Sequence, residues 1–183
     1  MNLFVKHQKK LLAFALLIAA SCAQADQGGV EPALSEASRA SALKTLEAAL
    51  QDKDISKQQY DSAISWVSST PCAGVSRSLS SERKRELGRA IAKQEKLKKV
   101  DVYQSFSDTG WNIIYVGTRV SDNGYFFYSS NPIAAARPIT VWGGAAMAFE
   151  TSEIEQWVLA NVPGIPARLA KCFAWHVTLN RDL

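Results

Sequence analysis

The sequence predicts an α+β fold in which N-terminal helices are followed by an antiparallel sheet. Apolar residues recur at helical spacing up to about residue 99, and strand-like runs separated by turn signals replace them from Val100 onward. The two kinds of segment are segregated rather than interleaved, which is typical of the α+β class. The expected order is three helices, a four-strand meander, one helix and a final strand. These elements form a single domain over residues 35–183, after a flexible lead-in at 26–34.

Three helices are expected in the first half of the domain. The first covers residues 35–51, where leucines lie at helical spacing among many alanines. The second begins at Ser56, because Ser56 and Gln59 have the spacing of a capping box, and Pro71 limits its C-terminal end. The third covers residues 80–99 and has only a thin apolar stripe.

The second half predicts mainly strands. The Asn123-Gly124 pair is a strong hairpin signal, and Gly143-Gly144 indicates a bulge or a close approach of another backbone. A helix is expected to end near residue 161. Residues 173–179 then alternate apolar and mixed positions, which predicts a final half-buried strand. The four strands of the meander are expected at residues 100–106, 111–118, 125–130 and 139–149.

Residues 1–25 have the organisation of a secretory signal peptide. Lysines in residues 6–10 precede an apolar run of about ten residues, which is too short to span a bilayer of ~30 Å. The small-residue motif at 23–25 predicts cleavage before Asp26. Cys22 follows small residues, so acylation of Cys22 is the minor alternative. We therefore expect a periplasmic protein, attached to the outer membrane if Cys22 carries lipid.

Cys72 and Cys172 are the two cysteines that remain beyond the leader. An even pair in an oxidising compartment predicts a disulfide. It would close a loop of about 100 residues, for which the chain-entropy model gives ~4.7 kcal/mol. The alternative is a catalytic thiol, which needs a nearby base, and His176 is the only histidine beyond the leader.

The sequence contains little catalytic machinery. No Cys/His cluster has zinc-site spacing, and no serine lies in a Gly-x-Ser-x-Gly elbow. His176 is expected to be an ordinary structural residue. We expect no catalytic residue, no metal site and no cofactor. The remaining candidates for acid–base chemistry are carboxylate pairs, whose separation a sequence does not show, drawn from Asp101, Asp108, Asp122 and Glu150.

Positive charge is concentrated in the third predicted helix. Three of the 21 lysines and arginines lie in the leader, so 18 basic residues face 17 acidic residues in the mature chain. Residues 77–99 nevertheless hold nine basic residues against three acidic ones. Such a helix is a solvated face, or it meets an acidic partner, a phosphate backbone or an anionic membrane. The lack of aromatics in this segment disfavours a membrane, and export disfavours nucleic acid.

The aromatic residues of the predicted sheet indicate a second candidate surface. Both faces of the second and third strands carry large side chains, so helices cover both faces or one face offers Tyr and Trp to a partner. The basic helix becomes the preferred site if the two tyrosines of the third strand are buried against the protein's own helices. The predicted binding residues are Trp111, Tyr115, Arg119, Asp122, Asn123, Tyr125 and Tyr128.

In general type the chain is similar to small exported bacterial proteins that bind a secreted toxin. The shared features are a leader, a compact domain with one disulfide, and few candidate catalytic residues. This likeness implies a periplasmic inhibitor or immunity protein that neutralises an antibacterial toxin through protein–protein contact. No nucleic acid and no transmembrane segment are expected after leader removal. The alternatives are a periplasmic hydrolase of the cell envelope and an accessory subunit of an envelope or secretion assembly.

Overall fold

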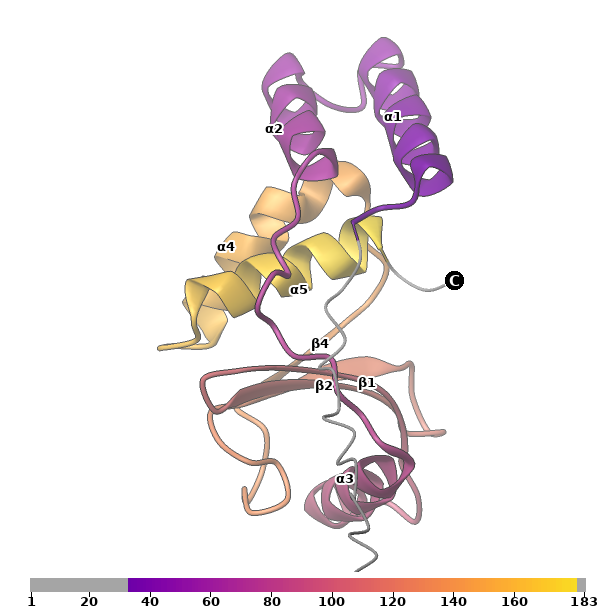
Figure 1. The fold of residues 1–183 in the computed structure, drawn as a ribbon. Helices are drawn as coiled ribbons and strands as arrows, with labels where there is room; N and C mark the ends of the chain where they lie inside the picture. Colours follow the sequence, from indigo (N-terminus) through magenta and orange to yellow (C-terminus); the bar gives the residue numbers. More distant parts are fainter. Residues whose placement is uncertain (1–32, 181–183) are drawn as a thin grey trace, which may run out of the picture.

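The computed structural model describes residues 33–180. The predicted signal peptide, its cleavage site and Cys22 lie outside the described residues. Figure 1 shows the elements stacked in layers, with a sheet between helices on both sides. One face of the sheet is covered by α4 (Thr151–Asn161) and α5 (Ala167–Leu179), and the other by α3 (Ser81–Gln94). The predicted α+β class is confirmed.

The first two helices form a pair at the far end of the molecule, beyond α4 and α5 (Figure 1). These are α1 (Glu36–Gln51) and α2 (Lys57–Val67). Their N-termini are set by local hydrogen bonds, and the predicted capping box between Ser56 and Gln59 is present. Apolar side chains from both helices join the core around α5. No helix within residues 33–180 is long and apolar enough to cross a membrane.

The sheet is the predicted antiparallel meander, in the order β1-β2-β3-β4. A bulge interrupts β1 at Tyr103, because Val102 pairs with Val116 and Gln104 already pairs with Tyr115. Gly143 ends the fourth strand and Gly144 has a φ of +128°, so this strand is shorter than predicted. The bounds are β1 Asp101–Asp108, β2 Trp111–Gly117, β3 Gly124–Tyr128 and β4 Thr140–Gly143.

The predicted final strand over residues 173–179 is wrong, because these residues form the second half of α5. This helix packs beside α4 and against the sheet, and most of its residues are buried. Cys172 to Val177, in the second half of the helix, are all buried, so this stretch has no exposed polar positions to mark it as a helix. Chance alternation over seven residues then resembled a half-buried strand. A short η1 turn (Ala148–Glu150) precedes α4.

The predicted disulfide between Cys72 and Cys172 is confirmed, with the two Cα atoms 4.5 Å apart. It joins the segment after α2 to the middle of α5. Both cysteines are buried in the core cluster that also contains Tyr125 and Phe127 of β3. The cross-link therefore ties the α1–α2 pair to the central layers.

Candidate functional site

The two tyrosines of β3 are core residues. The Tyr125 side chain is 0% exposed, and its ring centroid lies 5.1 Å from that of Phe173 on α5. The Tyr128 side chain is 1% exposed, lies on the opposite face of the sheet and donates a hydrogen bond of 2.8 Å to Gln94 Oε1 on α3. Helices cover both faces of β3, so the prediction that Tyr125 and Tyr128 contact a partner is wrong.

The other five predicted residues do not form one surface. Trp111 begins β2 and lies against Gly164 in the α4–α5 turn, away from the β2–β3 connection. At that connection Asn123 Nδ2 donates to Tyr115 Oη over 3.3 Å. Arg119 forms an ion pair with Asp101 at the start of β1. The fold therefore brings Tyr115, Arg119 and Asn123 to one end of the sheet, with Asp122 exposed in the same connection.

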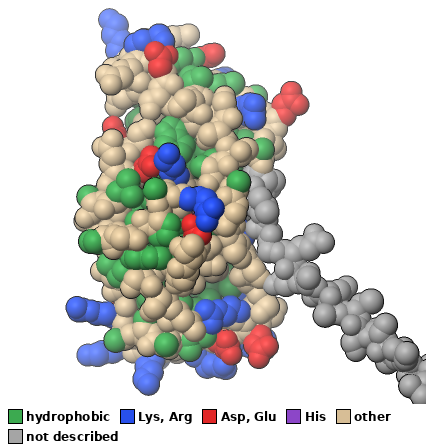
Figure 2. Space-filling view, turned by 60° about the vertical axis from the view of Figure 1, so that its left-hand side comes forward, with side chains coloured by type: hydrophobic (Ala, Val, Ile, Leu, Met, Phe, Trp, Pro, Cys, Tyr) green, Lys and Arg blue, Asp and Glu red, His purple; other side chains and the backbone are tan. Residues whose placement is uncertain are grey.

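A cleft of about 630 Å³ lies at this end, between α3 and the start of β1. Gly88 and Ala92 line it on α3, and Val100 to Tyr103 line it on the strand side. Figure 2 shows Lys and Arg side chains gathered at the end of the molecule where α3 lies. Five basic residues line the cleft, namely Lys84, Arg85, Arg89, Lys98 and Lys99.

Local sequence explains how α3 forms one wall of this cleft. Ser80 caps the helix by accepting a hydrogen bond of 3.1 Å from the Arg83 N–H. Leu87 and Ile91 bury the apolar stripe against the sheet. A Cβ at Gly88 would lie 2.8 Å from the Val100 carbonyl oxygen. The absence of a side chain at position 88 therefore allows α3 to pack directly against the backbone that leads into β1. The long basic side chains are left around this contact.

The charges of the cleft are unequal. Asp101 is the one acidic residue of its lining, and it is paired with Arg119 at 2.6 Å and with Lys99 at 3.2 Å. The hydrogen bond from Arg119 lowers the pKa of Asp101, so this carboxylate stays ionised. The positive charges of Arg119 and Lys99 offset its negative charge. Within residues 33–180, the other four cations of the lining form no ion pair. The cleft therefore presents net positive charge.

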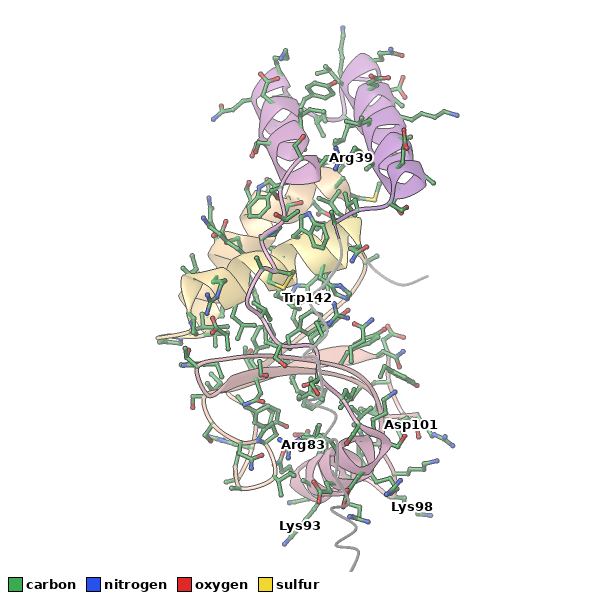
Figure 3. The ribbon with its side chains drawn as sticks, viewed as in Figure 1. Arg39, Arg83, Lys93, Lys98, Asp101 and Trp142 are labelled. Carbon is green, nitrogen blue, oxygen red and sulfur yellow. A yellow bond between two sulfur atoms is a disulfide. The ribbon has the colours of Figure 1, made fainter. Side chains whose placement is uncertain are left out.

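Lys98 and Asp101 lie at the same end of the molecule in Figure 3, whereas Lys93 projects from α3 away from the sheet. Lys93 is exposed and does not line the cleft. Lys84, Arg85 and Arg89 of α3 thus line the cleft, whereas Lys93 on the same helix and Lys96 just after it face open solvent. This division makes a matched comparison of the two groups possible.

An aromatic row crosses the sheet and ends at the cleft. The rings of Tyr115 and Tyr125 stack at 4.3 Å, and Trp142 on β4 lies 5.9 Å from Tyr125. Figure 3 shows Trp142 between the sheet and α5. At the other end Tyr103 lies 5.5 Å from Tyr115 and is 44% exposed. Tyr103 could not be predicted from the sequence, because the bulge in β1 turns this residue toward the face of Tyr115.

The groups considered for catalysis are engaged elsewhere. His176 is buried, with Nε2 2.8 Å from Gln104 Oε1, and Cys172 is in the disulfide. Asp108 forms a two-point ion pair with Arg168, at 2.6 and 3.0 Å. Glu150 accepts a hydrogen bond from the Met147 N–H. In the part of the chain that the structure describes, no group of three His, Cys, Asp or Glu side chains could hold a metal.

Comparison with protein-family models, with curated proteins and with solved structures found no match for this chain. The function is therefore inferred from the cleft. It combines a concave surface, four cations that form no ion pair within residues 33–180, and a partly exposed tyrosine on a strand at the edge of the sheet. This arrangement suits the binding of an anionic surface with some apolar contact.

Proposed function

We propose that this chain is an exported binding protein that holds an acidic protein partner in the cleft between α3 and β1. The single observation that carries the proposal is the convergence of cations from two segments on one concave surface. Lys84, Arg85 and Arg89 come from α3, while Lys98 and Lys99 come from the segment that leads into β1. A solvated helix face spreads its charges into water, whereas convergent cations create a local positive potential.

The surroundings of the cleft favour a protein over other anions. Tyr103 is 44% exposed and also lines the cleft, and tyrosine and arginine are the residue types enriched at the energetic centres of protein interfaces. A membrane surface would need bulky apolar side chains on the same helix face. The exposed face of α3 is instead dominated by Lys, Arg and Glu.

We further propose that the partner is a secreted antibacterial toxin, which the chain inhibits by binding. This choice depends on the predicted export to the periplasm and on the likeness in type to small exported inhibitors. An immunity protein acts where the toxin acts, and a disulfide suits an oxidising compartment. Binding in this proposal involves no catalysis.

The experiment uses the product of the toxin gene expected beside the gene for this chain. The mature chain, beginning at Asp26, is mixed with that toxin, and the dissociation constant and stoichiometry are measured by calorimetry. Lys84→Gln/Arg89→Gln removes two cleft charges, and Lys93→Gln/Lys96→Gln removes two exposed charges outside the cleft. The two double variants have the same net charge, so they separate a local contact from general attraction.

We expect the wild type to form a stable complex of fixed stoichiometry with the toxin. The cleft variant should lose about 1–3 kcal/mol of binding free energy, and the control variant well under 1 kcal/mol. Association should also slow steeply between low and moderate salt. Equal losses in the two double variants would exclude the cleft, and absence of a complex would exclude the inhibitor. Neutralisation at much less than equimolar chain would instead indicate an enzyme.

A further inference from the structure

We infer that the partner inserts one aromatic side chain, the anchor ring, into the cleft between α3 and β1, with carboxylates on both sides of that ring. This inference rests on the proposed function, because it specifies which part of the acidic partner the same cleft receives. Three observations carry it: a gap on one flank of α3, the apolar walls of that gap, and the cations around it.

The two flanks of α3 meet the rest of the molecule differently. On one flank the segment that follows β3 closes against the helix. Arg83 donates a hydrogen bond of 2.9 Å to Asn131 Oδ1, and Gln94 Nε2 donates bonds of 2.7 and 2.9 Å to two carbonyls of the same segment. Arg83 and Gln94 are eleven residues apart, or about three turns, so they lie on the same flank. The protein's own chain therefore covers α3 on this flank.

The other flank of α3 holds the cleft. Gly88 and Ala92, one turn apart, form the helix wall, and Val100, Val102 and Tyr103 contribute to the facing wall. Glycine and alanine have no long side chain to fill the space between the walls, and a volume of about 630 Å³ is left. Pockets that bind small organic groups measure about 300–1,000 Å³. The cleft therefore has room for the side chain of one bulky residue.

The walls of the cleft favour an aromatic side chain. Val100 and Val102 belong to the apolar cluster between α3 and the sheet, so a ring in the cleft would extend that cluster. Tyr103 is 44% exposed and offers a second ring for a tilted or offset contact. Arg85 and Arg89 also line the cleft, and a guanidinium over the face of a ring adds a cation–π attraction. An aliphatic side chain would gain burial but neither of these contacts.

The cations of the cleft determine what flanks the anchor ring. Lys84 and Arg89 extend from α3, while Lys98 lies in the segment that leads into β1. Within residues 33–180 these three side chains form no ion pair, whereas Lys99 is already paired with Asp101. Positive charge is thus available on both walls. A segment with a carboxylate before and after its aromatic residue would offset the charge on both sides of the ring.

The test measures whether the cleft selects the anchor ring beyond the charge around it. Two nine-residue peptides of equal charge have glutamates on both sides of a central residue, which is tryptophan in one and alanine in the other. Their dissociation constants are measured at low salt from the backbone amide shifts of the isotope-labelled, oxidised mature chain. The same NMR spectra show whether each protein variant is folded.

Two protein variants separate filling of the cleft from addition of apolar surface. Ala92→Leu fills the cleft from the wall on α3 and leaves the net charge unchanged. Ala48→Leu adds the same side chain at an exposed position of α1, which does not line the cleft. The comparison of the two peptides on the wild type needs no variant, so it tests the inference even if Ala92→Leu does not fold.

We expect the tryptophan peptide to bind the wild type about tenfold or more tightly than the alanine peptide, because the ring loses contact with water in the cleft. The ratio should fall below about threefold in Ala92→Leu and keep its wild-type value in Ala48→Leu, since only the first substitution touches the contact. The toxin should lose about tenfold or more in affinity for Ala92→Leu and less than about threefold for Ala48→Leu. Lys84→Gln/Arg89→Gln should weaken the binding of both peptides.

The outcomes separate this inference from the proposed function. Equal affinity of the wild type for the two peptides would overturn the anchor ring, and so would a preference for tryptophan that a folded Ala92→Leu retains. Failure of both peptides to bind at millimolar concentration would also overturn it. In each case the proposed function stands if the toxin still distinguishes the cleft variant from the control variant, and it fails if the toxin binds both alike.

Other occupants of the cleft would be recognised in the same series of measurements. A wild-type dimer that Lys84→Gln/Arg89→Gln dissociates would identify a second copy of this chain as the occupant. Tighter binding of free N-acetyltryptophan than of the tryptophan peptide would indicate a site for a small aromatic acid. Tighter binding of anionic vesicles would indicate a lipid. Each of these results would overturn the anchor ring of a protein partner.

Discussion

Removal of the disulfide should cost a large part of the stability of this domain. The bond joins residues 100 positions apart, and for a loop of that length the chain-entropy model gives ~4.7 kcal/mol. Measured losses for native disulfides fall between about 2 and 5 kcal/mol. We expect Cys72→Ala/Cys172→Ala to fall in the upper half of this range, since the cross-link connects the segment after α2 to the buried helix α5.

The assays are equilibrium unfolding in urea and thermal unfolding, both monitored by circular dichroism, for the oxidised wild type and the double variant. In a chain of this size 1 kcal/mol corresponds to about 2–4 °C, so a loss of ~4.7 kcal/mol lowers Tm by roughly 9–19 °C. Reductant should bring the wild type to the stability of the variant and leave the variant unchanged. A loss below about 1 kcal/mol, or equal destabilisation of both proteins by reductant, would refute the reasoning.

Three further predictions concern stability and processing. Tyr128→Phe removes the donor to Gln94 Oε1 and should cost about 1–2 kcal/mol in urea unfolding. Burial raises the pKa of Tyr128 above its ordinary value of 10.0, so the wild type should lose stability as the pH rises above 10, and Tyr128→Phe should lose less over the same range. Gly88→Ala places a Cβ 2.8 Å from a backbone oxygen and should destabilise the fold by about 1–3 kcal/mol, whereas Gly143→Ala, with its nearest atom at 3.6 Å, should be close to neutral. N-terminal sequencing of the exported protein should begin at Asp26 or at an acylated cysteine, and an intact initiator methionine in an exporting cell would contradict export.

Several elements could be predicted because the interactions that define them are local. Ser35, Ser56 and Ser80 each accept a hydrogen bond from an N–H three residues later, and such caps depend on a few neighbouring residues. The turns between the first three strands lie where Gly-containing motifs interrupt the apolar runs. The disulfide could also be predicted, since only two cysteines remain beyond the leader.

The identity of α5 and the burial of β3 were decided by tertiary packing. Every residue from Cys172 to Val177 is buried, so the pattern over residues 173–179 has no exposed polar stripe and did not distinguish a helix from a strand. The aromatic side chains of β3 are equally compatible with a covered or an open face. Their exposure depended on where α3 and α5 pack, which no residue of β3 encodes.

The composition of residues 77–99 was enough to predict a strongly basic helix before the sheet, and this helix was the alternative binding site. Only the tertiary structure placed part of its charge beside the edge of β1. That placement depends on Gly88 approaching the Val100 carbonyl, and a separate feature, the bulge in β1, turns Tyr103 to the face of Tyr115. Both features are relations between two segments, and a linear pattern contains no term for the distance between segments that meet only when the chain folds.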